Sequence, residues 1–163
     1  MNLIVNVSKN WAIGKDNSLL FHLSQDMKFF KAHTTGKTIV MGRKTLESLP
    51  GGKPLPNRKN IVLTRNKDYY PDGVEVYNSI SDFTEDNPDT EDVYVIGGES
   101  LYRDLLPYCK KAFVTKVDAS VDDADAFMQD LDLHPDWEIT DTSEELSEKG
   151  LTFSFVTYEN IQK

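Results

Sequence analysis

The sequence predicts an α/β fold in a single domain, residues 1–163, with a mostly parallel central sheet, an antiparallel C-terminal hairpin and about four flanking helices. Two observations lead to this prediction. Short apolar runs of strand length alternate with segments of helical pattern along most of the chain, and two further strand-like segments follow one another near the C-terminus. No repeat, low-complexity tract or linker divides the sequence.

The first elements follow from local pattern. Residues 3–7 form a short apolar run, which predicts a buried strand, and residues 8–23 are predicted to be a long loop. Ser24 is a favourable helix N-cap, so we expect a helix over residues 24–34. The β-branched run at 38–41 predicts the next strand.

The later elements are bounded by glycine, proline and serine, which commonly end or begin regular structure. We expect a helix at 43–49 after Gly42, an irregular crossing at 50–56, strands at 60–63 and 74–76, and a helix from the N-cap Ser79 to about 85. A strand at 93–96 and a helix that begins after Gly98 and ends at 106, before Pro107, are expected next. The last expected elements are a strand at 112–117 and paired antiparallel strands at 137–140 and 151–158.

Charge and composition exclude several classes of function. A formal net charge of −9 and a pI near 4.8 argue against a nucleic acid or an anionic membrane as partner. The longest apolar runs are too short to span a bilayer, and the N-terminus lacks the features of a signal peptide. Cys109 is the only cysteine and the three histidines are scattered, so we expect no intrachain disulfide, no metal site and a cytoplasmic protein.

The predicted loop is the first candidate for a functional segment. Irregular segments of this length are uncommon in compact domains. Its apolar residues, among them Ile13, Leu19, Leu20 and Phe21, argue against disorder. A lid that packs on a ligand and a packed surface loop without function both agree with this pattern.

Asp26 is the second candidate. It lies in the first turn of the predicted helix, where an acidic side chain is favoured by the helix dipole, so it could be a simple helix-start residue. However, Asp26, Phe30 and His33 follow a spacing of i, i+4 and i+7 and therefore share one helix face. A carboxylate that borders an apolar stripe is a candidate binding or catalytic group.

Two strand-to-helix turns are candidates for phosphate binding. Gly97 and Gly98 let the backbone approach a ligand closely, although a plain turn explains them equally well in isolation. Arg43 and Lys44 begin another helix, where cations oppose the dipole, and Arg65 ends the neighbouring strand. In an acidic protein, such a cluster suggests a phosphate-rich ligand, and the alternative is a solvated basic rim.

Together and in this order, these segments resemble dihydrofolate reductase across essentially the whole chain. The matching motifs are Ala-Ile-Gly-Lys-Asp-Asn at 12–17, the helix acid Asp26, Met-Gly-Arg-Lys-Thr at 41–45, Pro-Leu-Pro-Asn-Arg-Lys-Asn at 54–60, Val-Ile-Gly-Gly at 95–98, and Thr115. Each motif is unspecific by itself, but six in register leave little room for chance. The resemblance implies NADPH as cofactor and reduction of dihydrofolate to tetrahydrofolate for one-carbon metabolism.

The resemblance also implies substrate and catalytic residues. Asp26 would bind the pterin 2-amino and N3 groups, Thr115 would support it by a hydrogen bond, and Arg58 would bind the glutamate α-carboxylate. The ring walls would be Ile4, Val5, Met27, Phe30, Leu49, Leu55 and Ile96. The catalytic set would be Asp26, Phe21 and Thr115. A hydride would reach pterin C6 while water admitted by the loop protonates N5, with Asp26 as electrostatic stabiliser.

On the cofactor side, the resemblance implies that residues 12–18 cover the nicotinamide and that the two strand-to-helix turns bind the phosphates. The implied cofactor residues are Asn6, Ile13, Gly14, Asn17, Ser18, Leu19, Gly42, Arg43, Lys44, Thr45, Leu63, Thr64, Arg65, Ile96, Gly97, Gly98, Glu99, Ser100, Leu101 and Tyr102.

The sequence departs from the family pattern at several positions. Phe21 stands where the family usually has Trp, and Leu20 replaces the customary proline before it. Asn6 replaces a small apolar residue that the family places near the nicotinamide amide. An additional glycine makes the match ambiguous over 49–53, and the acidic stretch 122–127 is one residue out of step with the family, so no role is assigned there.

Two other functions are consistent with parts of this pattern. A reductase of the same fold acting on another heterocycle, as in the riboflavin pathway, would share the cofactor residues but would not need Asp26 and Arg58 together. A non-catalytic nucleotide-binding protein would need neither. The joint presence of both residues favours dihydrofolate as substrate. The resemblance also leads us to expect diaminopyrimidine and pteridine antifolates as inhibitors and a monomeric protein.

Overall fold

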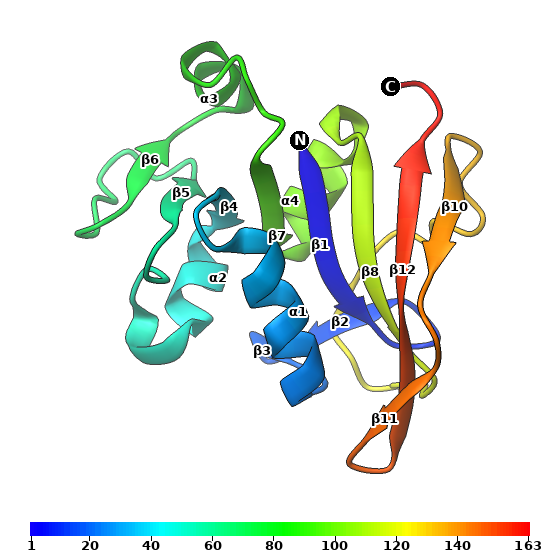
Figure 1. Cartoon of the computed structure of the whole chain (residues 1–163). Coiled ribbons are helices and arrows are strands. Elements are labelled where there is room, and N and C mark those ends of the chain that lie inside the picture. Colours follow the sequence, from blue (N-terminus) through cyan, green and yellow to red (C-terminus); the bar gives the residue numbers. More distant parts are fainter.

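The computed structural model describes residues 1–163 and confirms the predicted fold class, with four α-helices around a mostly parallel sheet (Figure 1). The strands are β1 (Asn2–Val7), β2 (Ala12–Lys15), β3 (Ser18–Leu19), β4 (Thr38–Gly42), β5 (Lys59–Leu63), β6 (Glu75–Tyr77), β7 (Val93–Gly97), β8 (Lys111–Val117), β9 (Ala126–Phe127), β10 (Trp137–Thr142), β11 (Leu146–Glu148) and β12 (Leu151–Asn160). The helices are α1 (Ser24–Thr34), α2 (Arg43–Ser48), α3 (Ile80–Asp86) and α4 (Glu99–Leu105), with short 3₁₀ turns at Pro50–Gly52 and Leu106–Tyr108.

The large sheet has the strand order β10-β12-β8-β1-β7-β4-β5-β6, with β11 paired to β12. Every neighbouring pair from β8 across to β6 is parallel. β12 is antiparallel to β8, β10 and β11, which confirms the predicted C-terminal pairing. β12 therefore lies inside the sheet, with β10 and β11 beyond it.

Alternation along the strands produces a core on each face of the sheet, with α1 and α2 on one face and α4 on the other (Figure 1). The larger core includes Val40 of β4 and Leu101 of α4. The smaller core joins Met41, the next residue of β4, to Leu46 of α2. No helix of the protein combines the length and apolarity that crossing a bilayer requires.

The prediction of a long loop at residues 8–23 is wrong. β2 and β3 form a hairpin there, and β9 adds a third strand on the other side of β2. Asp16 and Asn17 form the turn with φ of 50° and 60°, a left-handed conformation that Asp and Asn tolerate better than most residues. The strands are too short to show a period in the sequence, and β9 comes from far downstream.

The N-cap prediction for Ser24 is also wrong. Leu23 holds the N-cap position and provides no side-chain cap. Glu148 of β11 caps the helix instead: it accepts hydrogen bonds from the backbone N–H of Ser24 over 2.6 Å and of Gln25 over 3.1 Å, and from the Ser24 hydroxyl over 2.9 Å. These bonds, that of the Ser24 N–H first, lower the pKa of Glu148 to about 2.

Glu148→Gln is therefore expected to lower the melting temperature in a pH-dependent way. Because the pKa of Glu148 in the folded protein is about 2 and the ordinary value is 4.5, its charge stabilises the fold above about pH 4.5. This contribution is lost as the pH falls towards 2. The difference in melting temperature between the two proteins should be full at pH 7 and close near pH 2, as measured by circular dichroism. Glu145→Gln, at an exposed position before β11, is the control, and a difference that does not change with pH would contradict the expectation.

Candidate active site

Asp26, in the first turn of α1, is bound through both carboxylate oxygens to the sheet. Thr115 Oγ1 donates a hydrogen bond to Asp26 Oδ1 over 2.6 Å, which confirms the predicted contact. Asn6 Nδ2 donates to Asp26 Oδ2 over 2.8 Å. Asn6 of β1 and Thr115 of β8 are direct register partners on adjacent parallel strands, so their side chains leave the same face of the sheet.

The structure corrects the predicted place of one residue of β1 and gives a protein partner for another. The side-chain amide of Asn6, which is predicted to lie near the nicotinamide amide, donates to Asp26. Val5 was expected to wall the substrate together with Ile4, but its side chain belongs to the larger core, on the opposite face of the sheet. The alternation of side chains along a strand accounts for the position of Val5.

β1 and β7 separate at the end of the sheet nearest to Asp26. Their pairing stops after Leu3 and Val95, although β1 continues to Val7. The hydroxyl of Tyr102, from α4, donates to the carbonyl of Ile4 over 2.7 Å. Burial, and to a lesser extent the charge of Asp26, raise the pKa of Tyr102, so this hydroxyl stays protonated and remains a donor. Where the strands separate, the carbonyl of Ile4 on β1 is therefore bound by the Tyr102 hydroxyl.

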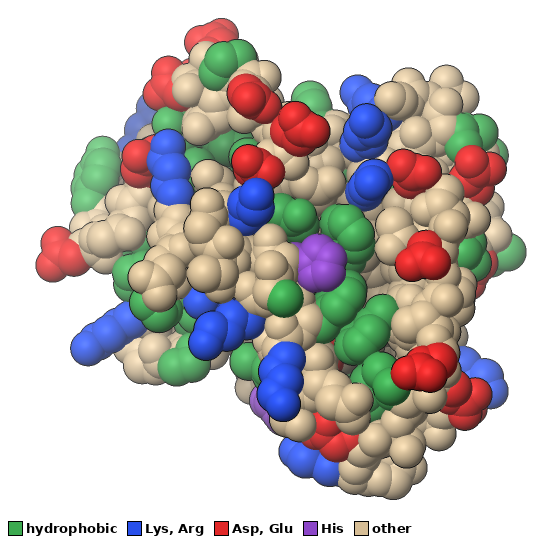
Figure 2. All heavy atoms as spheres, in the orientation of Figure 1, with side chains coloured by type: hydrophobic (Ala, Val, Ile, Leu, Met, Phe, Trp, Pro, Cys, Tyr) green, Lys and Arg blue, Asp and Glu red, His purple; other side chains and the backbone are tan.

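The predicted apolar walls lie on two sides of this position. Ile96 of β7, with Leu49 and Leu55, packs partly buried against the smaller core. On α1, Phe30 is half-buried and Met27 is 53% exposed. Figure 2 shows hydrophobic side chains gathered in the middle of the face that carries α1. Partly exposed apolar groups on both sides suit the contact of a flat ligand ring.

Arg58 is fixed beside the end of α1 opposite to Asp26. Its Nη1 donates to Thr34 Oγ1 over 3.1 Å and its Nε donates to the carbonyl of Pro56 over 2.9 Å. Burial lowers the pKa of Arg58, and no carboxylate pairs with it. Asp26 and Thr34 are eight residues apart on α1, or about 12 Å at 1.5 Å per residue, so the unpaired cation and the carboxylate mark the two ends of an extended site.

A glycine cradle lies where β7 meets α4. Gly97 has a φ of 130°, which strongly favours glycine. A Cβ on Gly97 or on Gly98 would come within 3.4 Å or 3.5 Å, respectively, of the Thr45 hydroxyl of α2. The backbone of both glycines thus packs directly against the hydroxyl of Thr45, and at Gly97 also against the ring of Tyr102.

Cations surround the neighbouring strand ends. Arg43 forms an ion pair with Glu47 one turn along α2, over 2.8 Å. Arg65 and Lys44 are exposed and have no ion-pair partner. Thr64 lies directly after β5 and before Arg65, and its hydroxyl accepts a hydrogen bond from the backbone N–H of Asn66. The structure thus brings together the predicted basic residues of two separate motifs.

The β2–β3 hairpin is attached to the rest of the site by contacts that the sequence did not reveal. Asn17 Nδ2 donates to the carbonyl of Lys44 over 3.0 Å. Asp125 accepts from the backbone N–H of Asp16 over 2.9 Å, and Lys15 forms an ion pair with Asp123. No role was predicted for the acidic stretch at 122–127, because its register with the family is shifted. The feature of the sequence that could have indicated these contacts is the run of acidic residues within 122–127, with which Lys15 of the hairpin can pair.

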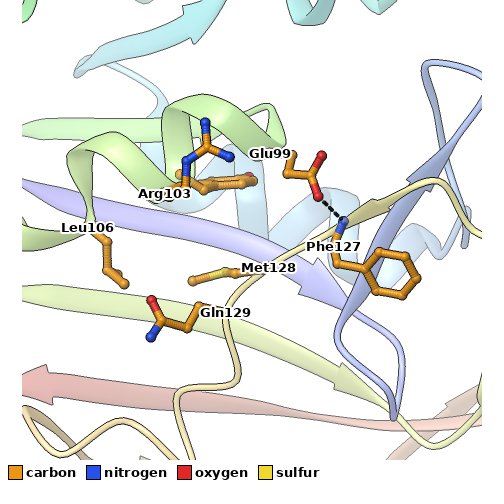
Figure 3. A pocket seen from close by; sticks show the side chains of 7 residues that line it. Glu99, Arg103, Leu106, Phe127, Met128 and Gln129 are labelled. Carbon is orange, nitrogen blue, oxygen red and sulfur yellow. Dashed lines mark hydrogen bonds between the residues drawn. The ribbon is translucent and has the colours of Figure 1, made fainter.

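Several other residues that are predicted to bind the cofactor have side chains that contact other parts of the protein. Glu99 accepts a hydrogen bond from the backbone N–H of Phe127 over 3.0 Å and lines a pocket of about 300 Å³ on the α4 side (Figure 3). Leu101 is buried in the larger core, and Ile13 and Leu63 pack against that core. The remaining ones, Gly14, Ser18, Leu19, Gly42 and Ser100, lie partly or fully exposed around the cradle and the hairpin.

The match to a known family agrees with this geometry. The model of the family described as dihydrofolate reductase matches residues 1–160. The chain belongs to this family. It is therefore an oxidoreductase that uses NADPH and reduces dihydrofolate.

Individual dihydrofolate reductases are similar over most of their length. That of Neisseria meningitidis serogroup A is 38% identical over 158 residues, which cover 97% of this chain and 96% of the relative. That of Bacillus subtilis is 44% identical over 117 residues, 72% of this chain and 68% of the relative. The solved structure of the Enterococcus faecalis enzyme, in complex with NADP(H) and the compound RAB-propyl, superimposes with a TM-score of 0.87 at 33% identity and covers 98% of this chain and 95% of that one.

Phe21 is the departure from the dihydrofolate reductase pattern that was predicted to matter in catalysis. It is half-buried and packs against the cluster of Leu23, Val117 and Phe153. Its ring has no hydrogen-bond donor. The protein donors that reach the Asp26 carboxylate are therefore those of Thr115 and Asn6.

Proposed function

We propose that the enzyme reduces 7,8-dihydrofolate by adding a hydride at pterin C6 and a proton at N5, which yields 5,6,7,8-tetrahydrofolate for one-carbon metabolism. The observation that supports this proposal most directly is the carboxylate of Asp26, which two neighbouring strands hold at the edge of a partly apolar site. A fixed carboxylate matches the adjacent 2-amino and N3 groups of a pterin ring, which can donate two parallel hydrogen bonds.

The cofactor residues proposed here fit a dinucleotide. A pyrophosphate would bind at the backbone of the glycine cradle beside the hydroxyl of Thr45, which packs against both glycines, and Lys44 adds a charge. Arg43 and Arg65, with Thr64, would bind the adenosine 2′-phosphate. NADPH, when bound, supplies the hydride. The β2–β3 hairpin would cover the nicotinamide and exclude bulk water, because its contacts with Lys44 and Asp125 hold it beside the same strand ends.

Asp26 acts in this proposal as an electrostatic stabiliser. A carboxylate that binds the 2-amino edge of the pterin cannot also reach N5 on the other side of the ring system. The proton at N5 would come from water admitted beside the hairpin, and the negative charge of Asp26 would stabilise the protonated pterin. Thr115 would keep the carboxylate oriented, and Phe21 would pack near the hairpin as an apolar contact.

Arg58 is proposed to bind the α-carboxylate of the glutamate tail. Its unpaired guanidinium and its position at the far end of α1 support this role. The same site would take diaminopyrimidine and pteridine antifolates through Asp26. A monomeric state and a cytoplasmic location stay predictions.

Arg58→Leu should raise the Kd of dihydrofolate by about tenfold, because a charged hydrogen bond is lost. It should leave the Kd of a pterin without a glutamate tail within about twofold of its wild-type value. Fluorescence titration of both ligands against the NADPH-bound enzyme measures the two effects. Arg103→Leu, at an exposed position of α4, is the matched control. An equal loss for both ligands would assign Arg58 a structural role.

The proposed reaction is tested by following the absorbance at 340 nm with NADPH and dihydrofolate and by identifying the product. Tetrahydrofolate in a 1:1 ratio to oxidised cofactor is expected. Oxidation of NADPH with a pyrimidine of the riboflavin pathway, and not with dihydrofolate, would contradict the proposal. The joint presence of Asp26 and Arg58 in one site argues against that second candidate.

A further inference from the structure

We propose that Asn6 is a positioning residue for substrate binding, acting through the carboxylate of Asp26. This inference deepens the proposed function and rests on the role given there to Asp26. Asn6 Nδ2 donates to Asp26 Oδ2 over 2.8 Å, and Thr115 Oγ1 donates to Oδ1 over 2.6 Å. Each carboxylate oxygen therefore has one protein donor.

The register of the sheet explains why both donors meet one carboxylate. Asn6 and Thr115 are paired positions on the parallel strands β1 and β8, so their side chains leave the same face of the sheet side by side. Asp26 comes from α1, on that face. Two donors from adjacent strands fix the rotation of the carboxylate about its Cβ–Cγ bond, which a single donor leaves free to turn.

The number of acceptor positions makes the arrangement suitable for a ligand. An ionised carboxylate offers about four lone-pair sites, two on each oxygen. Thr115 and Asn6 use one on each oxygen, and one on each remains for two parallel donors of a ligand. Asn6 thus fixes the carboxylate without blocking a bidentate contact, and part of the ordering cost of binding is already met in the free enzyme.

Asn6 serves this purpose because it lies at the border of the site. Its side chain is half-buried, and no other protein hydrogen bond is made by its amide. Asn2, two positions before Ile4 on the same strand and face, is the natural comparison: its amide donates to the carbonyls of Glu91 and Val93 and has no contact with Asp26. Comparing variants of the two asparagines can therefore distinguish a role in ligand binding, expected of Asn6, from a structural role, expected of Asn2.

The experiment compares Asn6→Ala with Asn2→Ala. Asn6→Ala should raise the KM for dihydrofolate about tenfold, the effect typical of removing a hydrogen bond to a charged group, while kcat and the KM for NADPH change by less than twofold. A selective effect on KM is expected because Asn6→Ala changes only the orientation in which the carboxylate holds the 2-amino edge of the ring, a contact made in the ground state and the transition state alike. The charge of Asp26, which stabilises the protonated pterin, is kept. Asn2→Ala should lower the melting temperature and leave all three kinetic constants within twofold.

A double-mutant cycle tests whether Asn6 acts through Asp26. In the Asp26→Asn background, Asn6→Ala should change the Kd of dihydrofolate by less than twofold, measured by fluorescence titration of the NADPH-bound protein. A tenfold effect that persists there, an unchanged KM in Asn6→Ala, or an increase in the KM for NADPH alone would each overturn the inference. The last outcome would return Asn6 to the nicotinamide.

A ligand-free measurement separates this inference from the proposed function. In the NMR spectrum of the free enzyme, the side-chain amide of Asn6 should change its chemical shift in Asp26→Asn, whereas the amide of Asn2 should not. If Asp26→Asn kept full activity, the proposed role of Asp26 would fail whatever the spectrum showed. If the Asn6 amide did not respond, the inference would fail while the role of Asp26 stood.

Discussion

Asp26→Asn should lower kcat/KM for dihydrofolate about a hundredfold or more at neutral pH, within the range typical of a positioned acid–base or electrostatic group. Asparagine keeps the shape of the side chain but removes the negative charge that stabilises the protonated pterin. It also replaces one acceptor oxygen by an amide donor. Either Thr115 or Asn6, each of which donates to this side chain in the wild-type enzyme, then meets a second donor. Steady-state kinetics at 340 nm measure the loss.

The loss of activity must be distinguished from a loss of structure. The circular dichroism spectrum and the Kd of NADPH should remain close to those of the wild-type enzyme, because Asp26 contacts neither the glycine cradle nor the cations. Glu85→Gln, at an exposed acid of α3, is the control. A variant that keeps more than about half of the wild-type activity would show that Asp26 does not have the proposed role.

NADPH should be preferred to NADH by about thirtyfold or more in kcat/KM, and Arg43→Ala with Arg65→Ala should reduce this preference to a few-fold. The 2′-phosphate would form charged hydrogen bonds with both arginines, for which about 2 kcal/mol is reasonable at partly exposed side chains. Arg65 has no ion-pair partner, whereas Arg43 is paired with Glu47 and must share its guanidinium. The single change of Arg65 should therefore have the larger effect.

Kinetics with each cofactor across the single and double variants measure this preference. Arg103→Ala should not change it, because Arg103 is an exposed arginine of α4 that pairs with Asp104. Added salt should weaken NADPH binding more than NADH binding, since exposed charges are screened. Equal kcat/KM for the two cofactors in the wild-type enzyme would rule out a 2′-phosphate site at these arginines.

Much of the fold could be predicted from local pattern. The β-branched and apolar runs are strands, Ser79 does cap α3 by accepting from the N–H of Asp82, and the C-terminal strands pair antiparallel. The hairpin at β2–β3 was missed because its strands are too short to display a period and its third strand is remote. The cap of α1 was missed because it comes from Glu148, which is distant in the sequence.

For the candidate site, too, the sequence indicated local features, whereas contacts between distant segments needed the tertiary structure or the family resemblance. The sequence by itself determined which residue types were present: an acid on an apolar helix face, two glycines at a strand end, and cations in an acidic chain. Their spacing within single elements fixed their faces, since local periodicity depends only on backbone geometry. The contact between Thr115 and Asp26 came from the family resemblance, and the hydrogen bond of 2.6 Å agrees with it.

Only the tertiary structure decided what Asn6 contacts. In the sequence, Asn6 is a polar residue in an apolar strand, and nothing local distinguishes a cofactor contact from a bond to Asp26. Its partner depends on the register between β1 and β8 and on the position of α1 over that face. Strand register arises from long-range pairing and packing, so a substitution whose meaning depends on it can be read only once the strands are placed side by side.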